Sequence, residues 1–158
     1  MSKENLFVGA RPYGEESADI AVRGNRIVAV GKEARSAVPE AEVVDVTGLV
    51  ALPGLVDLHT HLREPGQEDA ETVFTGTRAA AVGGYTCVFA MANTNPVADT
   101  ASVVEQVKML GDKAGWVEVR PIGAVTVGLE GKTLSSMSAM AKSEAAVRVF
   151  SDDGKCVA

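Results

Sequence analysis

The second part of the chain alternates short apolar runs with stretches of helical periodicity, and this order restricts the fold more than any other feature. Apolar runs occupy residues 55–58, 85–91 and 146–150. Between them, apolar residues recur at three- and four-residue spacing, most clearly over 99–111. Strands that alternate with helices form a parallel sheet, either doubly wound or closed into a barrel. We therefore predict an α/β fold for residues 52–158.

Turn and capping residues set the expected boundaries of these elements. The expected elements are a buried strand over 55–58, a helix from the acids at 68–71 to Gly83-Gly84, a strand over 85–91, a helix capped by Asp99 or Thr100 and closed by Gly111, a strand region over 117–127, a weaker helix within 134–142 and a strand over 146–150.

Residues 1–51 have a different pattern and predict a small β unit. Polar and apolar residues alternate over 19–23 and 26–31, on either side of Gly24-Asn25. Two such runs about a tight turn are typical of a β-hairpin. A third short strand is expected over 42–46. No group of residues in this part suggests catalysis.

Composition and charge argue against several classes of protein. The net charge of −6 argues against nucleic acid or an anionic membrane surface as a partner. No apolar stretch approaches the roughly 20 residues of a membrane span, and no secretion signal is visible at the N-terminus. Cys87 and Cys156 do not suggest a disulfide framework. We expect a cytoplasmic protein with reduced thiols that acts on a small molecule.

Both histidines of the chain, His59 and His61, follow the first apolar run. Residues i and i+2 of a strand project to the same face, so the two imidazoles can reach one ion. Zinc accepts neutral imidazole at about 2.0–2.1 Å. The alternative is a pair of ordinary polar residues at a strand end. We favour a metal site because all of the histidine lies in one place and Arg63 follows at once.

Further polar residues follow the other strands. Asn93 comes after the second apolar run, and Asp152 and Asp153 come after the last one. Because sites on α/β folds gather at the carboxyl ends of strands, these side chains are candidates for the same site. Either aspartate can complete a His-His-Asp ligand set. The alternative for Asp-Asp-Gly is a turn or a helix cap.

Arg63 and Asn93 are candidates for substrate binding. A guanidinium group binds a carboxylate in a bidentate manner, and an asparagine amide donates hydrogen bonds to a carboxylate or a ring carbonyl. The alternative for Arg63 is a surface salt bridge with Glu64 or Glu68. For Asn93 it is a side-chain turn before Pro96.

Five blocks of the sequence resemble one known family. The blocks read PGLVDLHTH over 53–61, LREPG over 62–66, GGYT over 83–86, MANTNP over 91–96 and FSDDG over 150–154. The first block is similar to the opening metal motif of the amidohydrolase superfamily. All five, in this order, resemble the dihydroorotase family, specifically its bacterial class I members.

The resemblance implies a (β/α)8 barrel flanked by a small β-sandwich. Residues 1–51 would form the N-terminal half of the sandwich, completed by the C-terminus of the protein, and 52–158 the first half of the barrel. It implies one or two zinc ions held by His59, His61 and Asp153. Arg63 and Asn93, with His61, would bind the substrate carboxylate. The implied reaction is the reversible cyclisation of N-carbamoyl-L-aspartate to L-dihydroorotate in pyrimidine synthesis.

Two departures from the family pattern stand out. Ala92 replaces a common proline, for which we expect only a backbone adjustment. Family members also carry further histidine ligands and a general acid/base aspartate on later strands, which we expect beyond Ala158. We therefore expect this chain to be an N-terminal part of such a protein, inactive and poorly stable alone.

Other readings stay open. One is another cyclic amidohydrolase, such as a hydantoinase or an allantoinase. Another is a non-catalytic, dihydroorotase-like partner of aspartate carbamoyltransferase. Assembly as a homo-oligomer is also compatible with the sequence.

Overall fold

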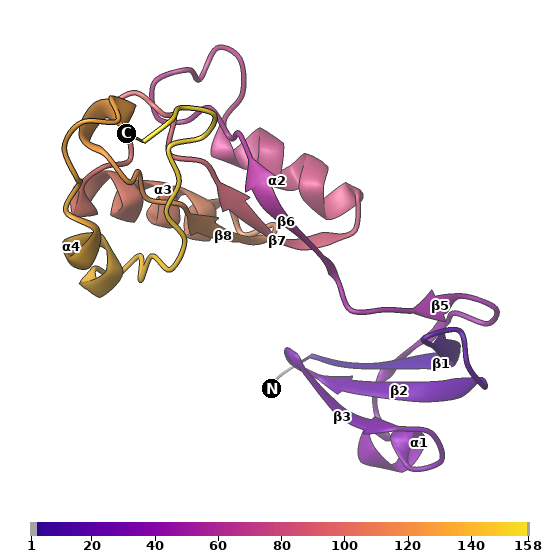
Figure 1. The fold of residues 1–158 in the computed structure, drawn as a ribbon. Coiled ribbons are helices and arrows are strands. Elements are labelled where there is room, and N and C mark those ends of the chain that lie inside the picture. The colour runs from indigo at the N-terminus through magenta and orange to yellow at the C-terminus, as the bar shows by residue number, and fades with distance from the viewer. Residues whose placement is uncertain (1–2, 158) are drawn as a thin grey trace. The chain divides into compact units, whose positions relative to one another are not determined.

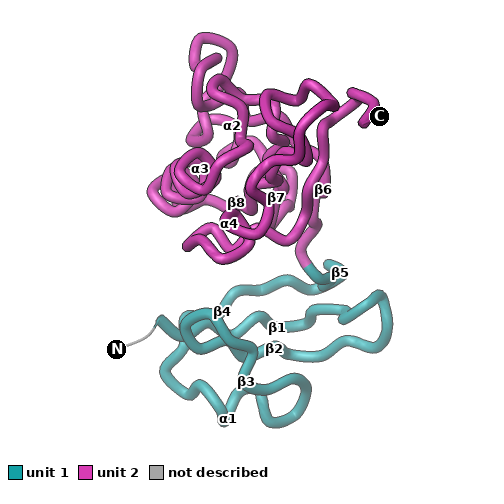
Figure 2. The backbone as a smooth tube through the Cα atoms, turned by 60° about the vertical axis from the view of Figure 1, so that its left-hand side comes forward, with its two compact units in different colours: residues 1–53 teal, residues 54–158 magenta. Residues whose placement is uncertain are grey.

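Two separate sheets organise the chain, one in residues 1–53 and one in residues 54–158 (Figures 1 and 2). The computed structural model describes residues 3–157. Within these residues, the helices all fall short of the length and apolar character that crossing a membrane requires. Each unit builds its own core, so the two are described in turn.

The first unit is a five-stranded sheet with one short helix. Its elements are β1 (Glu4–Pro12), β2 (Ala18–Arg23), β3 (Arg26–Val30), α1 (Ala34–Ala37), β4 (Glu42–Asp45) and β5 (Val50–Ala51). The strand order is β3-β2-β1-β4, with β5 also paired to β1. Strands β2 and β3 are antiparallel and form the predicted hairpin. The small core consists of Leu6, Ala21, Ala34 and Val38.

The second unit begins with two successive β-α-β crossovers. Its elements are β6 (Leu55–Thr60), α2 (Val73–Val82), β7 (Tyr85–Ala90), α3 (Ala101–Ala114), β8 (Glu118–Pro121), a 3₁₀ turn (Val127–Leu129) and α4 (Met137–Lys142). The strands pair in parallel in the order β6-β7-β8. This arrangement confirms the predicted parallel α/β sheet.

Helices α2 and α3 pack on one face of this sheet (Figure 1). Val88 of β7 and Val119 of β8 are each 1% exposed and meet Val73 of α2 and Val107 of α3. Alternate strand residues point to one face, so burial of this face follows directly from the apolar runs in the sequence. A second cluster, which includes Val104, packs the loops beyond β7 and β8 against α4.

Helix α2 begins later than predicted, at Val73. Thr72 caps it, and the side chains and backbones of Thr72 and Thr75 form a reciprocal capping box. The acids at 68–71 therefore lie outside the helix. The carboxylate at the helix N-terminus is instead Glu64, whose Oε2 accepts from the Val73 N–H at 2.7 Å.

The predicted end of the second helix at Gly111 is wrong, because α3 continues to Ala114. Gly115, with φ of +69°, takes the left-handed conformation that ends the helix. Gly111 is buried in the helix, where a Cβ would lie 2.4 Å from the Cβ of Val119. The glycine therefore permits close packing of α3 on β8 and does not stop the helix.

The strand predicted over 146–150 is also absent from residues 3–157, except for one parallel bridge between Phe150 and Gly123. Ala146 has a φ of +47°, which breaks the extended backbone at the start of this segment. The Arg148 guanidinium donates to the carbonyls of Ala141 and Val147. The segment nevertheless bonds to Gly123, just beyond the end of β8, through the Val149 carbonyl and the Ser151 N–H, which brings residues 151–154 to the strand ends.

The apolar run of β6 was predicted to be buried, and this is wrong for the chain described. Leu55 and Val56 are each 52% exposed and Leu58 is 67% exposed. Among residues 3–157, β6 pairs with β7 alone and lies at the edge of the sheet, and α2 and α3 pack on the one face described above. An uncovered apolar face and an open strand edge of this kind promote aggregation.

Candidate metal centre at the strand ends

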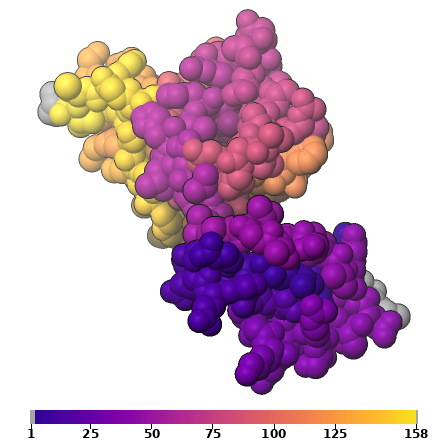
Figure 3. Space-filling view, turned by 90° about the vertical axis from the view of Figure 1, so that its right-hand side faces the viewer, coloured from indigo at the N-terminus to yellow at the C-terminus, as the bar shows by residue number. Residues whose placement is uncertain are grey.

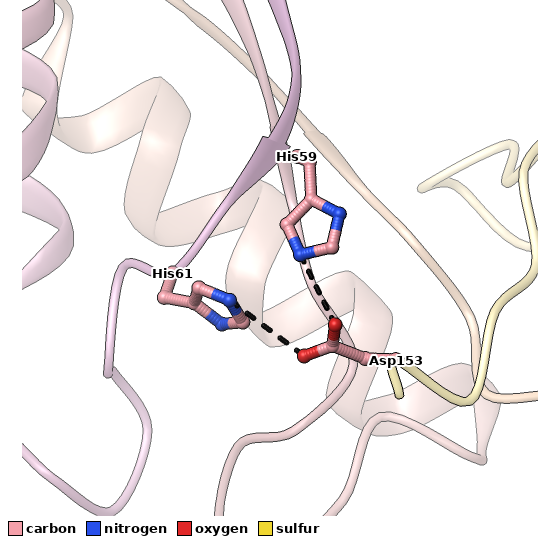
Figure 4. Close-up of side chains that lie close together, drawn as sticks. All are labelled: His59, His61 and Asp153. Carbon is pink, nitrogen blue, oxygen red and sulfur yellow. Dashed lines mark ion pairs between the residues drawn. The ribbon is translucent and has the colours of Figure 1, made fainter. Parts of the chain in front are cut away.

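Two histidines and one aspartate meet at the carboxyl end of β6 (Figure 4). The Nε2 atom of His59 lies 3.0 Å from Oδ1 of Asp153, and Nε2 of His61 lies 3.6 Å from Oδ2. One potential ligand atom from each of the three residues lies within 4.8 Å of the others. Two imidazole nitrogens and a carboxylate oxygen are a donor set that suits zinc, so these residues fit the metal that the sequence predicts.

Hydrogen bonds to β7 and to the residue after it hold the backbone at the end of β6, and so fix the positions from which the two histidine side chains project. The Thr60 hydroxyl donates to the Phe89 carbonyl at 3.0 Å, and the Met91 N–H donates to the Thr60 carbonyl at 2.8 Å. The His59 N–H donates to Oδ1 of Asp57 at 3.0 Å. The predicted same-face placement of His59 and His61 is what the structure shows, with ring centroids 5.2 Å apart.

Asp153 reaches the histidines because the chain turns sharply after residue 150. Its φ is +43°, an uncommon conformation for a residue with a side chain, and such residues gather at functional sites. Its N–H donates to the Ser151 hydroxyl at 3.1 Å. In the space-filling view the yellow C-terminal segment lies against the purple segment that contains the end of β6 (Figure 3).

Asp152, the competing ligand candidate, faces the other way. It is 4% exposed, and its Oδ1 accepts from the N–H groups of Val125 at 2.8 Å and Thr126 at 3.0 Å. Its Oδ2 accepts from the Thr126 hydroxyl. Burial by itself raises the pKa of Asp152, but the hydrogen bonds from Thr126 and Val125 outweigh it, so the pKa is lowered. Asp152 therefore anchors the loop.

Asn93 lies between two members of the group. Its Oδ1 is 3.0 Å from Nδ1 of His61, and its Nδ2 donates to Oδ2 of Asp153 at 3.0 Å. The turn that follows uses a different side chain, because the Thr94 hydroxyl donates to the Pro96 carbonyl at 2.8 Å. Thr94 therefore makes the side-chain turn before Pro96 that was the alternative role for Asn93, and the Asn93 side chain bonds to His61 and Asp153 instead.

Arg63 is half-buried in the loop after β6, with a φ of +62°. The salt bridges considered as alternatives do not form within residues 3–157. Glu64 accepts from the N-terminus of α2, and Glu68 accepts from the Gly66 N–H at 2.8 Å. Across the same residues, the guanidinium of Arg63 makes no ion pair or hydrogen bond, so the structure does not join it to the metal group.

Sequence reasoning missed Thr126. Its hydroxyl donates to Asp152 and also accepts from the Gly131 N–H at 2.9 Å, so it ties two loops together. The stretch 117–127 was predicted as a strand region, and no local pattern sets Thr126 apart from other strand threonines. Only its distant partners identify it.

The fold and the site together define a class: an α/β protein with two histidines and a carboxylate gathered at the ends of parallel strands. The family model described as dihydro-orotase-like matches residues 48–158, and the chain belongs to this family. This confirms the family that the sequence blocks predicted.

Similar proteins agree with this assignment. The dihydroorotase of Leifsonia xyli is 63% identical over 158 residues, and that of Streptomyces coelicolor is 62% identical over 157 residues. Each match covers 99% of this chain and 36% of the relative. The chain thus spans about a third of the length of these relatives.

A solved structure supports the fold. An L-hydantoinase (dihydropyrimidinase) from Arthrobacter aurescens superposes with a TM-score of 0.66 at 24% identity, over 82% of this chain and 29% of that one. The likeness confirms the predicted fold class, an α/β chain that forms part of a (β/α)8 barrel fold.

Proposed function

We propose that this chain contributes the first metal ligands and the substrate clamp of a dihydroorotase, which interconverts N-carbamoyl-L-aspartate and L-dihydroorotate in cytoplasmic pyrimidine synthesis. The observation that carries the proposal is the meeting of His59 and His61 with Asp153, from opposite ends of the second unit. The identity of 63% to a dihydroorotase supports the choice of reaction.

The proposed metal is zinc, as one or two ions. His59 and His61 would offer Nε2, and Asp153 a carboxylate with one oxygen toward each histidine. Bound zinc polarises a carbonyl group and lowers the pKa of water from about 15.7 toward 7. The contribution of the chain is a ligand group held by two anchored backbones, the end of β6 and the turn at 151–154.

The proposed substrate clamp consists of Arg63 and Asn93, with His61 lining the same pocket. The Arg63 side chain has no ion-pair partner among residues 3–157, which leaves its donors for a substrate carboxylate. The Nδ2 group of Asn93 has two N–H bonds, and Asp153 takes one of them. The second N–H can donate to the substrate.

The assay compares the 158-residue chain with the longest reading frame that contains it, both loaded with zinc. We expect the longer protein to cyclise N-carbamoyl-L-aspartate, and the 158-residue chain to bind zinc without turnover. Absence of turnover by the zinc-loaded longer protein would refute the proposal. Light scattering of the same samples tests association with a second copy or with added aspartate carbamoyltransferase.

A second candidate is another cyclic amidohydrolase, such as a hydantoinase, which the structural likeness at a TM-score of 0.66 favours. The two candidates differ in whether a substrate carboxylate is clamped. In the active protein, Arg63→Lys should raise KM for N-carbamoyl-L-aspartate by at least about tenfold, since a bidentate charged contact is lost. An unchanged KM, together with turnover of a hydantoin, would favour the hydantoinase.

A further inference from the structure

One amide group spans two of the three proposed ligands. Asn93 bonds to His61 through Oδ1 and to Asp153 through Nδ2, each at 3.0 Å. We propose that Asn93 is a positioning residue, which holds the neutral His61 imidazole in its Nδ1–H tautomer and so leaves the Nε2 lone pair free for the metal. The inference rests on the proposed metal site and adds a role for Asn93 before substrate binds.

The orientation of the amide follows from its two partners. The Asp153 carboxylate only accepts hydrogen bonds, so the amide group that faces it must be the donor Nδ2. Oδ1 then faces His61, and an amide oxygen only accepts. Nδ1 of His61 must therefore carry the proton. A flipped amide would place two acceptors, Oδ1 and the carboxylate, against each other.

The contact on the other side of the His61 ring agrees with this tautomer. Nε2 lies 3.6 Å from Oδ2 of Asp153, longer than a hydrogen bond, whereas Nε2 of His59 lies 3.0 Å from Oδ1. An unprotonated Nε2 does not donate to the carboxylate, which accounts for the longer distance. In the metal-free chain the same reasoning gives His59 the opposite tautomer, with Nε2–H donating to Asp153, so His59 has to give up this hydrogen bond and move its proton to Nδ1 before its Nε2 can bind a metal.

The amide is held by its surroundings. Ala92 is fully buried and Thr94 is 9% exposed, so Asn93 sits between two packed residues at the end of β7. The carbonyl of Ala92 also accepts from the Ala98 N–H at 3.0 Å. A fixed backbone lets one short side chain orient both partners, as groups that hydrogen-bond to metal ligands commonly do.

The test reads the tautomer directly in the metal-free, ¹⁵N-labelled 158-residue chain, with a chelator at about pH 8, above the ordinary imidazole pKa of about 6.5. The chain has two histidines, so a long-range ¹H–¹⁵N spectrum contains two imidazole patterns, which His59→Gln assigns. We expect His61 as Nδ1–H and His59 as Nε2–H. Free neutral imidazole side chains favour Nε2–H, so Nδ1–H at His61 is informative.

Two variants of Asn93 separate the hydrogen bonds. Asn93→Leu keeps the volume and removes both, so His61 should shift to Nε2–H and the affinity for Zn²⁺ should fall by about 10- to 100-fold. Asn93→Asp combined with Asp153→Asn exchanges the two groups, so that residue 93 still faces a donor at 153 and still offers an acceptor to His61; Nδ1–H should persist in this double variant. Asn95→Ala, in the exposed part of the same loop, is the matched control and should change neither tautomer nor affinity.

The proposal is overturned if wild-type His61 is Nε2–H, if Asn93→Leu leaves a folded chain with His61 as Nδ1–H, or if the double variant Asn93→Asp, Asp153→Asn loses that tautomer. Should Asn93→Leu lose amide dispersion, the wild-type spectrum and that of the double variant Asn93→Asp, Asp153→Asn still decide. His61 as Nδ1–H in a wild-type chain that binds no Zn²⁺ supports the positioning role and refutes the proposed metal function, so the two failures are distinguishable.

Discussion

Asp152 and Asp153 are neighbours in sequence but should respond to the same substitution in opposite ways. Asp152 is 4% exposed and accepts hydrogen bonds from two backbone N–H groups and the Thr126 hydroxyl. The Asp153 side chain is 15% exposed and faces the two histidines. Alanine at 152 should lower the free energy of unfolding, and alanine at 153 should lower the affinity for zinc.

The magnitude at Asp152 follows from the donors that alanine leaves behind. Asp152→Ala strands the N–H groups of Val125 and Thr126, at about 1–3 kcal/mol for each buried unsatisfied donor. The Thr126 hydroxyl can rotate toward another acceptor and adds little. We expect a loss of about 2–6 kcal/mol in the free energy of unfolding, a large part of the 5–15 kcal/mol typical of a domain. Asp153→Ala should cost about 1 kcal/mol or less, because its partners can bond to water.

The assay is urea unfolding of the 158-residue chain, paired with zinc titration of each variant at neutral pH. Asp152→Asn is the matched variant, since its amide oxygen still accepts from the two N–H groups. It should lose less stability than Asp152→Ala. Equal destabilisation by alanine at 152 and 153, or an Asp152→Ala chain as stable as wild type, would refute the reasoning.

The lowered pKa of Asp152 also predicts the pH dependence of stability. The unfolded carboxyl titrates near 3.9, and the folded carboxyl titrates below that value. As pH falls, the unfolded state takes up this proton first, so the contribution is complete above about pH 4 and is lost as pH falls through the folded pKa. Asp152→Asn should remove this part of the acid destabilisation. Identical acid profiles for wild type and variant would contradict the assignment.

Side-chain packing leads to two further predictions, one on the stability of a helix substitution and one on the reactivity of the two cysteine thiols. Gly111→Ala should lower the free energy of unfolding, measured in urea, by about 1–2 kcal/mol, because the cost of overpacking against Val119 exceeds the gain in helix propensity. The matched control, Gln106→Ala on the exposed side of the same helix, should leave stability unchanged. A Gly111→Ala chain more stable than wild type would contradict this reasoning. Burial, with the nearby Glu118 carboxylate, raises the pKa of the Cys87 thiol, so a thiol reagent should titrate the exposed Cys156 rapidly and Cys87 only on unfolding. Two equally fast thiols in the folded chain would contradict this.

Patterns that depend on neighbours along the chain were predicted correctly. The hairpin about Gly24-Asn25, the parallel strands and the place of His59 and His61 at the end of β6 all follow from periodicity and turn chemistry. Gly111 was misjudged, because a glycine that ends a helix and one that lets a helix approach a strand look the same in sequence. The strand over 146–150 failed because a strand also needs a partner along its length.

The sequence by itself determined the α/β class, the family and the candidate metal ligands, because strand alternation, helix spacing and the order of motif blocks are local properties. Strand ends and spacing left Asp152 and Asp153 as competing candidates, and only the family resemblance pointed to Asp153. Tertiary structure decided between them: the turn at φ of +43° sends Asp153 toward the histidines, while Val125 and Thr126 hold Asp152. The Asn93 bridge was decided in the same way, because its partners His61 and Asp153 lie far away along the chain and meet only when strand ends gather at one edge.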